Sequence, residues 1–247
     1  MNRLVCAILF LFGFAAMPNF AAGAELFIRQ PPEVESKDTF VYQGVADANF
    51  DTTQAGPFFG KVLGVGQTTT GHTTESLIQF DLSNVGMTSA QAYWSFLELR
   101  AVSTVAVGFG ANPTPATPVV VDLYAVAGTW GETDVTWNTP APATGALFAS
   151  QTVDAIDQTY TFDITALVKQ WLDGTIPNNG MILKGNAPVP SGMTFAAAVF
   201  SSSSGTIGPR LTIVPEPSSV VLALSAAGAV GLLYRRRTMR RHRIASE

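Results

Sequence analysis

Two tryptophans and two carboxylates lie together in the segment Trp130–Pro140, whose sequence is WGETDVTWNTP. Aromatic rings beside polar groups are typical of sugar-binding sites, and paired carboxylates are the groups that hydrolyse glycosidic bonds. Glu132 and Asp134 lie two positions apart and would share one face of a strand. Trp130 and Trp137 lie seven apart and would face opposite sides of an unbroken strand. The segment is therefore either a site or a packed turn.

Other catalytic chemistry has little support in the sequence. Before the C-terminal tail the only histidine is His72, in a loop rich in Gly and Thr, and a triad needs a base, a nucleophile and an acid in contact. The single cysteine, Cys6, lies in the apolar N-terminus, so thiol nucleophiles and Cys-ligated metals are excluded from the rest of the chain. Asp154 and Asp157 form another carboxylate pair. Many solvated strand charges share a face as Glu132 and Asp134 would, so the spacing of that first pair is weak evidence for catalysis.

Oxygen-bearing side chains gather near the start of the predicted domain. The candidate calcium ligands are Asp38, Asp47, Asn49 and Asp51. Calcium is held by carboxylate and carbonyl oxygens without a fixed sequence motif, so these residues are a candidate site. Ordinary loop polarity with Asx-turns is the alternative.

A second candidate site lies on the predicted strand 91–102, where alternate side chains point to opposite faces. One face carries Tyr93, Ser95, Leu97 and Leu99. The other carries the candidate carbohydrate-binding residues Trp94, Phe96, Glu98 and Arg100. If the leucine face is the core, two aromatic rings lie exposed beside a charge pair, which is a platform suited to sugars. The alternative is that both faces are buried, or that the loop 109–118 covers the rings.

The elements that must position these residues are mostly strands. Short alternating or apolar runs separated by turn residues predict an all-β sandwich of about ten strands. The expected strands are 39–44, 61–66, 75–81, 91–102, 119–126, 148–153, 159–162, 181–184, 195–201 and 210–214.

One helix interrupts this pattern. Apolar residues at helical spacing form a stripe of Ile164, Leu167, Val168, Trp171 and Leu172. Asp163 or Thr165 is expected to cap the start of this helix and Gly174 to end it. The run 178–180 (NNG) then turns the chain into the next strand.

Both ends of the chain have the composition of targeting segments. Residues 1–24 combine Arg3, an apolar run and the small residues 22–24 (AGA), which predicts a secretory signal peptide; a membrane-anchoring helix is the alternative. Residues 25–214 then hold 7 basic and 16 acidic residues, a formal net charge of −9. So acidic a domain argues against nucleic acid as a partner.

At the C-terminus, Pro215, Glu216 and Pro217 precede the apolar run Ser218–Tyr234 and a cluster of arginines. The arginines are Arg235, Arg236, Arg237, Arg240, Arg241 and Arg243. A helix over the apolar run would be about 25 Å long, and arginine side chains can extend its reach to span a membrane. The positive cluster would stay in the cytoplasm and leave the acidic domain outside.

The order of these three parts resembles the PEP-CTERM sorting signal. That resemblance implies recognition by an exosortase, cleavage near the motif, and delivery to the cell surface or extracellular matrix. An uncleaved tail anchor is the alternative. The expected divisions are 1–24 (signal peptide), 25–214 (sandwich), 215–237 (sorting signal with transmembrane helix) and 238–247 (basic cytoplasmic tail).

Five further pieces, in order, resemble the DNRLRE domain, a carbohydrate-binding-module-like β-sandwich of exported proteins. They are Asp38–Val41 with Asn49 and Phe50, Ser76–Ser83 (SLIQFDLS), Trp130–Pro140, Phe162–Trp171 (FDITALVKQW) with Asn179-Gly180, and Phe200–Ser202 with Pro209–Leu211. The resemblance covers about residues 38–213. It implies that Trp130 and Trp137 both pack inward around a turn. We therefore interpret Trp130–Pro140 as a structural segment that holds the edge of the sandwich in place, with ligand bound elsewhere.

The sequence thus predicts a jelly-roll-like β-sandwich with one short helix. The expected function is noncatalytic binding of polysaccharide at the cell surface or in the matrix. A structural matrix or adhesion protein that recognises another protein is the alternative, and a carbohydrate-active enzyme is the third choice. Calcium is the one cofactor considered.

Overall fold

The structure is a computed structural model that describes residues 27–29, 36–50, 62–68, 71–105, 110–139, 144–185, 196–201 and 207–216. The predicted signal peptide, the apolar run 218–234 and the basic tail lie outside these ranges, as do Asp51, Pro217 and Arg235–Arg237. Among the described elements, none is a helix with the length and apolarity that a membrane crossing requires. Residues 26–214 form one compact unit, and the two ends of the chain are assigned to another.

The described residues form eleven strands and one α-helix. The strands are β1 (Phe27–Arg29), β2 (Ser36–Tyr42), β3 (Val62–Gln67), β4 (Thr73–Phe80), β5 (Ala92–Arg100), β6 (Val119–Val126), β7 (Thr144–Val153), β8 (Thr159–Asp163), β9 (Met181–Gly185), β10 (Ala196–Ser201) and β11 (Arg210–Pro215). The 3-10 turn η1 (Gln43–Val45) follows β2, and the helix α3 (Thr165–Leu172) follows β8. The ten predicted strands and the helix are confirmed, and β1 is a strand that the sequence did not reveal.

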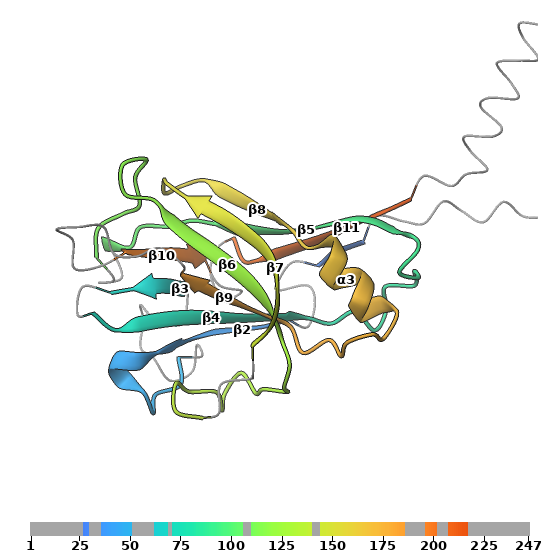
Figure 1. The fold of residues 1–247 in the computed structure, drawn as a ribbon, viewed down its shortest axis with the longest axis horizontal. Coiled ribbons are helices and arrows are strands. Elements are labelled where there is room, and N and C mark those ends of the chain that lie inside the picture. The colour runs from blue at the N-terminus through green and yellow to red at the C-terminus, as the bar shows by residue number, and fades with distance from the viewer. Residues whose placement is uncertain are drawn as a thin grey trace, which may run out of the picture. The chain divides into compact units, whose positions relative to one another are not determined.

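Two antiparallel sheets form the framework, as a β-sandwich requires (Figure 1). The small sheet has four strands in the order β1-β11-β5-β8. The large sheet has seven, in the order β10-β3-β4-β9-β6-β7, with β2 paired to β4. Because sequence neighbours such as β5 and β6 belong to different sheets, residues far apart in the chain meet on each face.

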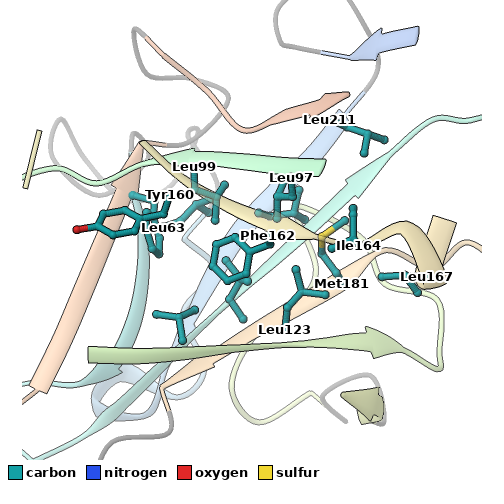
Figure 2. Close-up of a cluster of buried hydrophobic side chains, with 14 of the residues drawn as sticks. Leu63, Leu97, Leu99, Leu123, Tyr160, Phe162, Ile164, Leu167, Met181 and Leu211 are labelled. Atoms are coloured by element: carbon teal, nitrogen blue, oxygen red, sulfur yellow. The ribbon is translucent and has the colours of Figure 1, made fainter. Parts of the chain in front are cut away.

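The main hydrophobic core lies between the two sheets. Figure 2 shows Leu97, Leu99 and Phe162 of the small sheet opposite Leu123 and Met181 of the large one, and all five are at most 1 % exposed. These residues alternate with outward-facing ones along each strand, as the period of two predicted. The leucine face of β5 is therefore the core face.

The segment after β6 folds back over the outer face of the large sheet. A turn at residues 131–135, closed by the Val135 N–H donating to the Gly131 carbonyl (3.0 Å), lets both indoles of the segment pack inward. Trp130 is 8 % exposed and Trp137 is partly buried, and both contact a cluster that includes Leu77 and Ile182. The predicted inward packing of Trp130 and Trp137 is therefore confirmed.

The helix α3 lies at one end of the sandwich (Figure 1) and buries its predicted stripe. Leu167, Val168 and Trp171 are its buried residues. The N-cap is Ile164, without a side-chain cap, so the expectation that Asp163 or Thr165 caps the helix is wrong. Asp163 instead accepts hydrogen bonds from both the backbone N–H (3.0 Å) and the hydroxyl (2.6 Å) of Thr165, the first helical residue. Gly174, at φ +76°, follows the helix in the left-handed conformation that glycine favours.

The two ends of the described domain meet in the small sheet. Strand β1 pairs with β11 in the register Phe27↔Ile213 and Arg29↔Leu211. Strand β11 in turn neighbours β5. The first and last strands are therefore hydrogen-bonded to each other, and β11 ends at Pro215.

Candidate functional site

The outer face of the small sheet carries the four residues predicted to bind carbohydrate. On β5, Ser95, Leu97 and Leu99 are fully buried, so the alternate residues point outward. Trp94 is 48 % exposed, whereas Phe96, Glu98 and Arg100 are each partly exposed. The structure therefore brings Trp94, Phe96, Glu98 and Arg100 onto one surface, which we call the β5 face.

The aromatic rings on this face form a continuous group. The ring centroids of Trp94 and Phe96 lie 6.5 Å apart with an interplanar angle of 41°. Tyr93 joins them, with its centroid 4.5 Å from that of Trp94 and a tilt of 53°. Such contacts restrain side chains that would otherwise move freely in solvent, so the apolar surface is held in place before any ligand arrives.

Two ion pairs border the rings, and both join β5 to other segments. Glu98 Oε2 lies 3.5 Å from a guanidinium nitrogen of Arg210 on β11, and Arg100 lies 3.7 Å from the carboxylate of Asp157. All four side chains keep contact with solvent, so these pairs contribute little to stability. Their free N–H groups and oxygens can instead bind polar groups beside the rings.

Sequence reasoning misplaced one residue of this face and missed two others. Alternation put Tyr93 on the core face, but Tyr93 is 43 % exposed because the regular alternation of β5 begins only after Trp94. Arg210 and Asp157 join the face through strand order and a loop. No local signal in the sequence reveals which strand lies beside β5.

The candidate calcium ligands mostly hold the Trp130–Pro140 segment. The Asn49 side-chain amide donates to the carbonyls of Glu132 and Val135, both at 2.8 Å. The backbone N–H of Asp38 donates to Glu132 (2.9 Å), and the Asp47 carboxylate accepts from Asn138 (2.8 Å). Within the described ranges, no three His, Cys, Asp or Glu side chains gather around a metal position.

The carboxylates and the histidine considered for catalysis are not brought together as a site. Glu132 binds the Asp38 N–H, while the exposed Asp134 accepts a hydrogen bond from its neighbour Thr133 (3.2 Å). Asp154 accepts a hydrogen bond from the Tyr160 hydroxyl (3.0 Å). The His72 ring packs edge-on against Tyr42, with centroids 5.8 Å apart. Each of these groups has a local structural contact.

A separate polar cluster lies on the large sheet around Asp122, which is only 2 % exposed. The hydroxyls of Ser150 and Tyr124 both donate to its carboxylate, the latter at 3.4 Å. Burial and the neighbouring negative charge of Asp122 raise the pKa of the Tyr124 phenol, so this group stays a neutral donor. On the neighbouring strand β9, Lys184 lies in register with Asp122, and its ammonium nitrogen is 3.1 Å from the Glu75 carboxylate. The two hydroxyls thus supply hydrogen bonds to the buried Asp122 carboxylate, which is a structural role.

Comparison with known families assigns both parts of the chain. The model of the PEP-CTERM protein-sorting motif matches residues 214–237. A search of curated proteins gives no match. The model of carbohydrate-binding module family 96 matches residues 32–214, which is most of the chain and includes the β5 face. These matches confirm the resemblance to a carbohydrate-binding domain followed by a PEP-CTERM signal, and the chain belongs to carbohydrate-binding module family 96.

Proposed function

We propose that this chain is an exported, noncatalytic protein that binds polysaccharide at the cell surface or in the extracellular matrix. The β5 face of its jelly-roll-like sandwich would be the binding surface. Family membership supports carbohydrate as the ligand class, because carbohydrate-binding modules bind sugars without hydrolysing them. The sorting motif supports export and surface delivery.

The observation that carries the choice of surface is the exposed aromatic group on β5. Trp94 and Tyr93 keep 48 % and 43 % of their surfaces in solvent although their rings are fixed against each other. Sugar rings have apolar C–H faces and polar edges. A ligand of this kind can cover the indole while its hydroxyls reach the Glu98–Arg210 pair.

In this proposal the two ends of the chain direct the protein to the cell surface. Residues 1–24 would direct export and then be removed. An exosortase would recognise Pro215, Glu216 and Pro217 together with Arg235–Arg237. The helix 218–234 would hold the protein transiently in the inner membrane, with residues 238–247 in the cytoplasm, until cleavage releases the domain to the surface.

The test is retention of the full-length protein, purified in detergent, on immobilised neutral and acidic polysaccharides. We expect the double variant Trp94→Ala/Phe96→Ala to lose about tenfold or more in affinity for the retained glycan, because the apolar contact is lost. Leu147→Ala is the matched control, since Leu147 is an equally exposed apolar residue (52 %) on β7 of the other sheet.

The possible outcomes distinguish a wrong choice of binding surface from a wrong function. Unchanged retention by the double variant, with an unchanged melting temperature, would show that sugar binds elsewhere. No retention of any glycan by the wild-type protein would contradict polysaccharide binding altogether.

The second candidate function is recognition of another protein in the matrix. Exposed Tyr and Trp residues with arginines nearby are also enriched at protein interfaces, and the β5 face has this composition. Capture of a matrix protein that depends on Trp94, with no glycan retained, would favour this function.

A further inference from the structure

A cleft lies at the end of the sandwich that carries α3, separate from the β5 face. Its volume is about 980 Å³, which is in the range of small-molecule sites. Three parts of the chain line it: the paired ends of β2 and β4, the segment 81–88, and the end of α3 with the loop after it. The lining residues used below are Lys37, Gln79, Phe80, Met87, Trp171 and Leu172.

Hydrogen bonds hold the walls of this cleft in shape. In the segment 81–88, the Asp81 carboxylate accepts from both the backbone N–H and the hydroxyl of Ser83, each at 2.8 Å. On the opposite side, the Asn178 side-chain amide donates to the Phe80 carbonyl (2.9 Å), and the Asn178 backbone carbonyl accepts from the Gln79 side-chain amide (2.8 Å). A cleft that is already ordered costs a ligand less conformational entropy on binding.

The lining combines a broad apolar base with a few polar groups. Phe80 and Trp171 belong to the core and are only 1 % and 8 % exposed, so they close the base, and Met87 and Leu172 pack beside them. Lys37 is exposed and forms no ion pair in the described part of the chain, unlike Arg100, Lys184 and Arg210. The cleft thus offers apolar contact and an uncommitted cation together.

The shapes of the two surfaces differ in what they can hold. The β5 face is an outer sheet surface, along which the interior of a polysaccharide chain can lie. The cleft has walls from three segments and a base of core residues, so the terminal rings of a chain fit it better than the chain's interior. Its volume suits one or two sugar rings rather than a long polymer.

We propose that this cleft binds the end of a carbohydrate chain, with Trp171 and Met87 against the sugar ring and Lys37 and Gln79 at its hydroxyls. The proposal rests on the polysaccharide-binding function and assigns a second site to the same domain. The two sites respond differently to the ligand. The amount bound in the cleft should rise with the number of chain ends, whereas affinity for the β5 face should rise with chain length.

The test uses full-length protein with gluco-, manno- and xylo-oligosaccharides from disaccharide to hexasaccharide, and the parent β-glucan, mannan and xylan. Affinity is measured by calorimetry and by tryptophan fluorescence. In the Trp94→Ala/Phe96→Ala protein, which lacks the aromatic contact of the β5 face, we expect the affinity for the retained oligosaccharide series to be constant beyond the shortest members. Partial hydrolysis of the polymer should make a given mass of it a stronger competitor, because it then has more chain ends.

Two variants with matched controls locate this binding. Lys37→Gln should weaken oligosaccharide binding about tenfold, because a hydrogen bond to a charged group is lost. Lys169→Gln should not weaken it, because Lys169, which likewise forms no ion pair with any described residue, lines a different depression beside α3. Trp171→Phe should abolish the fluorescence change on oligosaccharide binding, whereas Trp94→Phe should leave it.

The results distinguish failure of this site from failure of the proposed function. Oligosaccharide binding that is lost in the Trp94→Ala/Phe96→Ala protein, or that survives Lys37→Gln in it, would overturn the cleft site and leave polysaccharide binding intact. If neither these series nor any of the neutral and acidic polysaccharides binds the wild-type protein, both proposals are wrong.

Discussion

At Gly180 the backbone before β9 passes so close to strand β4 that a side chain has no space. Its φ is +84°, and an added Cβ would lie 2.4 Å from the Ile78 carbonyl oxygen. We expect Gly180→Ala to lower the free energy of unfolding by about 2–4 kcal/mol, since a backbone clash adds to the cost of a left-handed residue. Denaturant unfolding measures this loss.

Gly174 is the control for that substitution. It also has a positive φ, +76°, but nothing lies within 4 Å of a Cβ added there. Gly174→Ala should therefore cost only about 1 kcal/mol, the conformational term alone. Equal losses at the two glycines would contradict the steric explanation.

Calcium binding is a prediction that also belongs to single residues. Asp47 and Asn49 already bind the Trp130–Pro140 segment, and Asp51 lies outside the described ranges. If an ion also joins Asp38, Asp47, Asn49 and Asp51, excess calcium should raise the melting temperature relative to a chelator, and Asp47→Asn should reduce the difference. Equal melting temperatures would exclude a stabilising calcium site.

At the scale of the elements, the segment that begins at Trp130 covers part of the large sheet's outer face, as an additional helix or sheet would. It covers apolar residues on the outer face of the large sheet, which would otherwise contact water. The Trp130 indole N–H donates to the Asn179 carbonyl (2.8 Å), and the Asn138 backbone N–H donates to the Ala46 carbonyl (3.0 Å). The turn after β2, the loop before β9 and this segment are therefore tied together.

Asn49 is the residue on which this arrangement most depends. The Asn49 side chain is only 8 % exposed and donates hydrogen bonds to two backbone carbonyls, those of Glu132 and Val135. Removing the side-chain amide leaves both carbonyls without this donor. We expect Asn49→Ala to cost roughly 2–3 kcal/mol and to shift tryptophan emission to the red as the segment loosens. Thr133→Ala, which removes only a bond to the adjacent residue, should leave both quantities nearly unchanged.

The sequence predicted elements well wherever a local pattern determines them. The stripe from Ile164 to Leu172 gave α3, and the alternation after Trp94 gave the outward face of β5. It failed where the information is not local. Three residues, Phe27–Arg29, are too few to show a period, and β1 exists because β11 lies beside it. The cleft lined by Lys37 and Trp171 likewise depends on segments that only folding brings together.

At the scale of the whole molecule, the sorting signal predicts that the mature protein is shorter than its gene product. A tag placed after residue 247 should be absent from protein recovered at the surface of an exosortase-bearing host, and the mass should fall by the residues after the motif. Replacing Pro215, Glu216 and Pro217 by alanine should retain the tag in the membrane fraction. Recovery of the intact tag on the surface protein would contradict cleavage.

The position of β11 gives the domain a defined path for mechanical load. This strand runs directly into Pro215, and its neighbour in the small sheet is β5, which presents Trp94. If the C-terminus is attached to the surface and a glycan on the β5 face is pulled along the strands, tension crosses a single strand boundary. The hydrogen bonds between β11 and β5 then carry the force directly between the two attachment points.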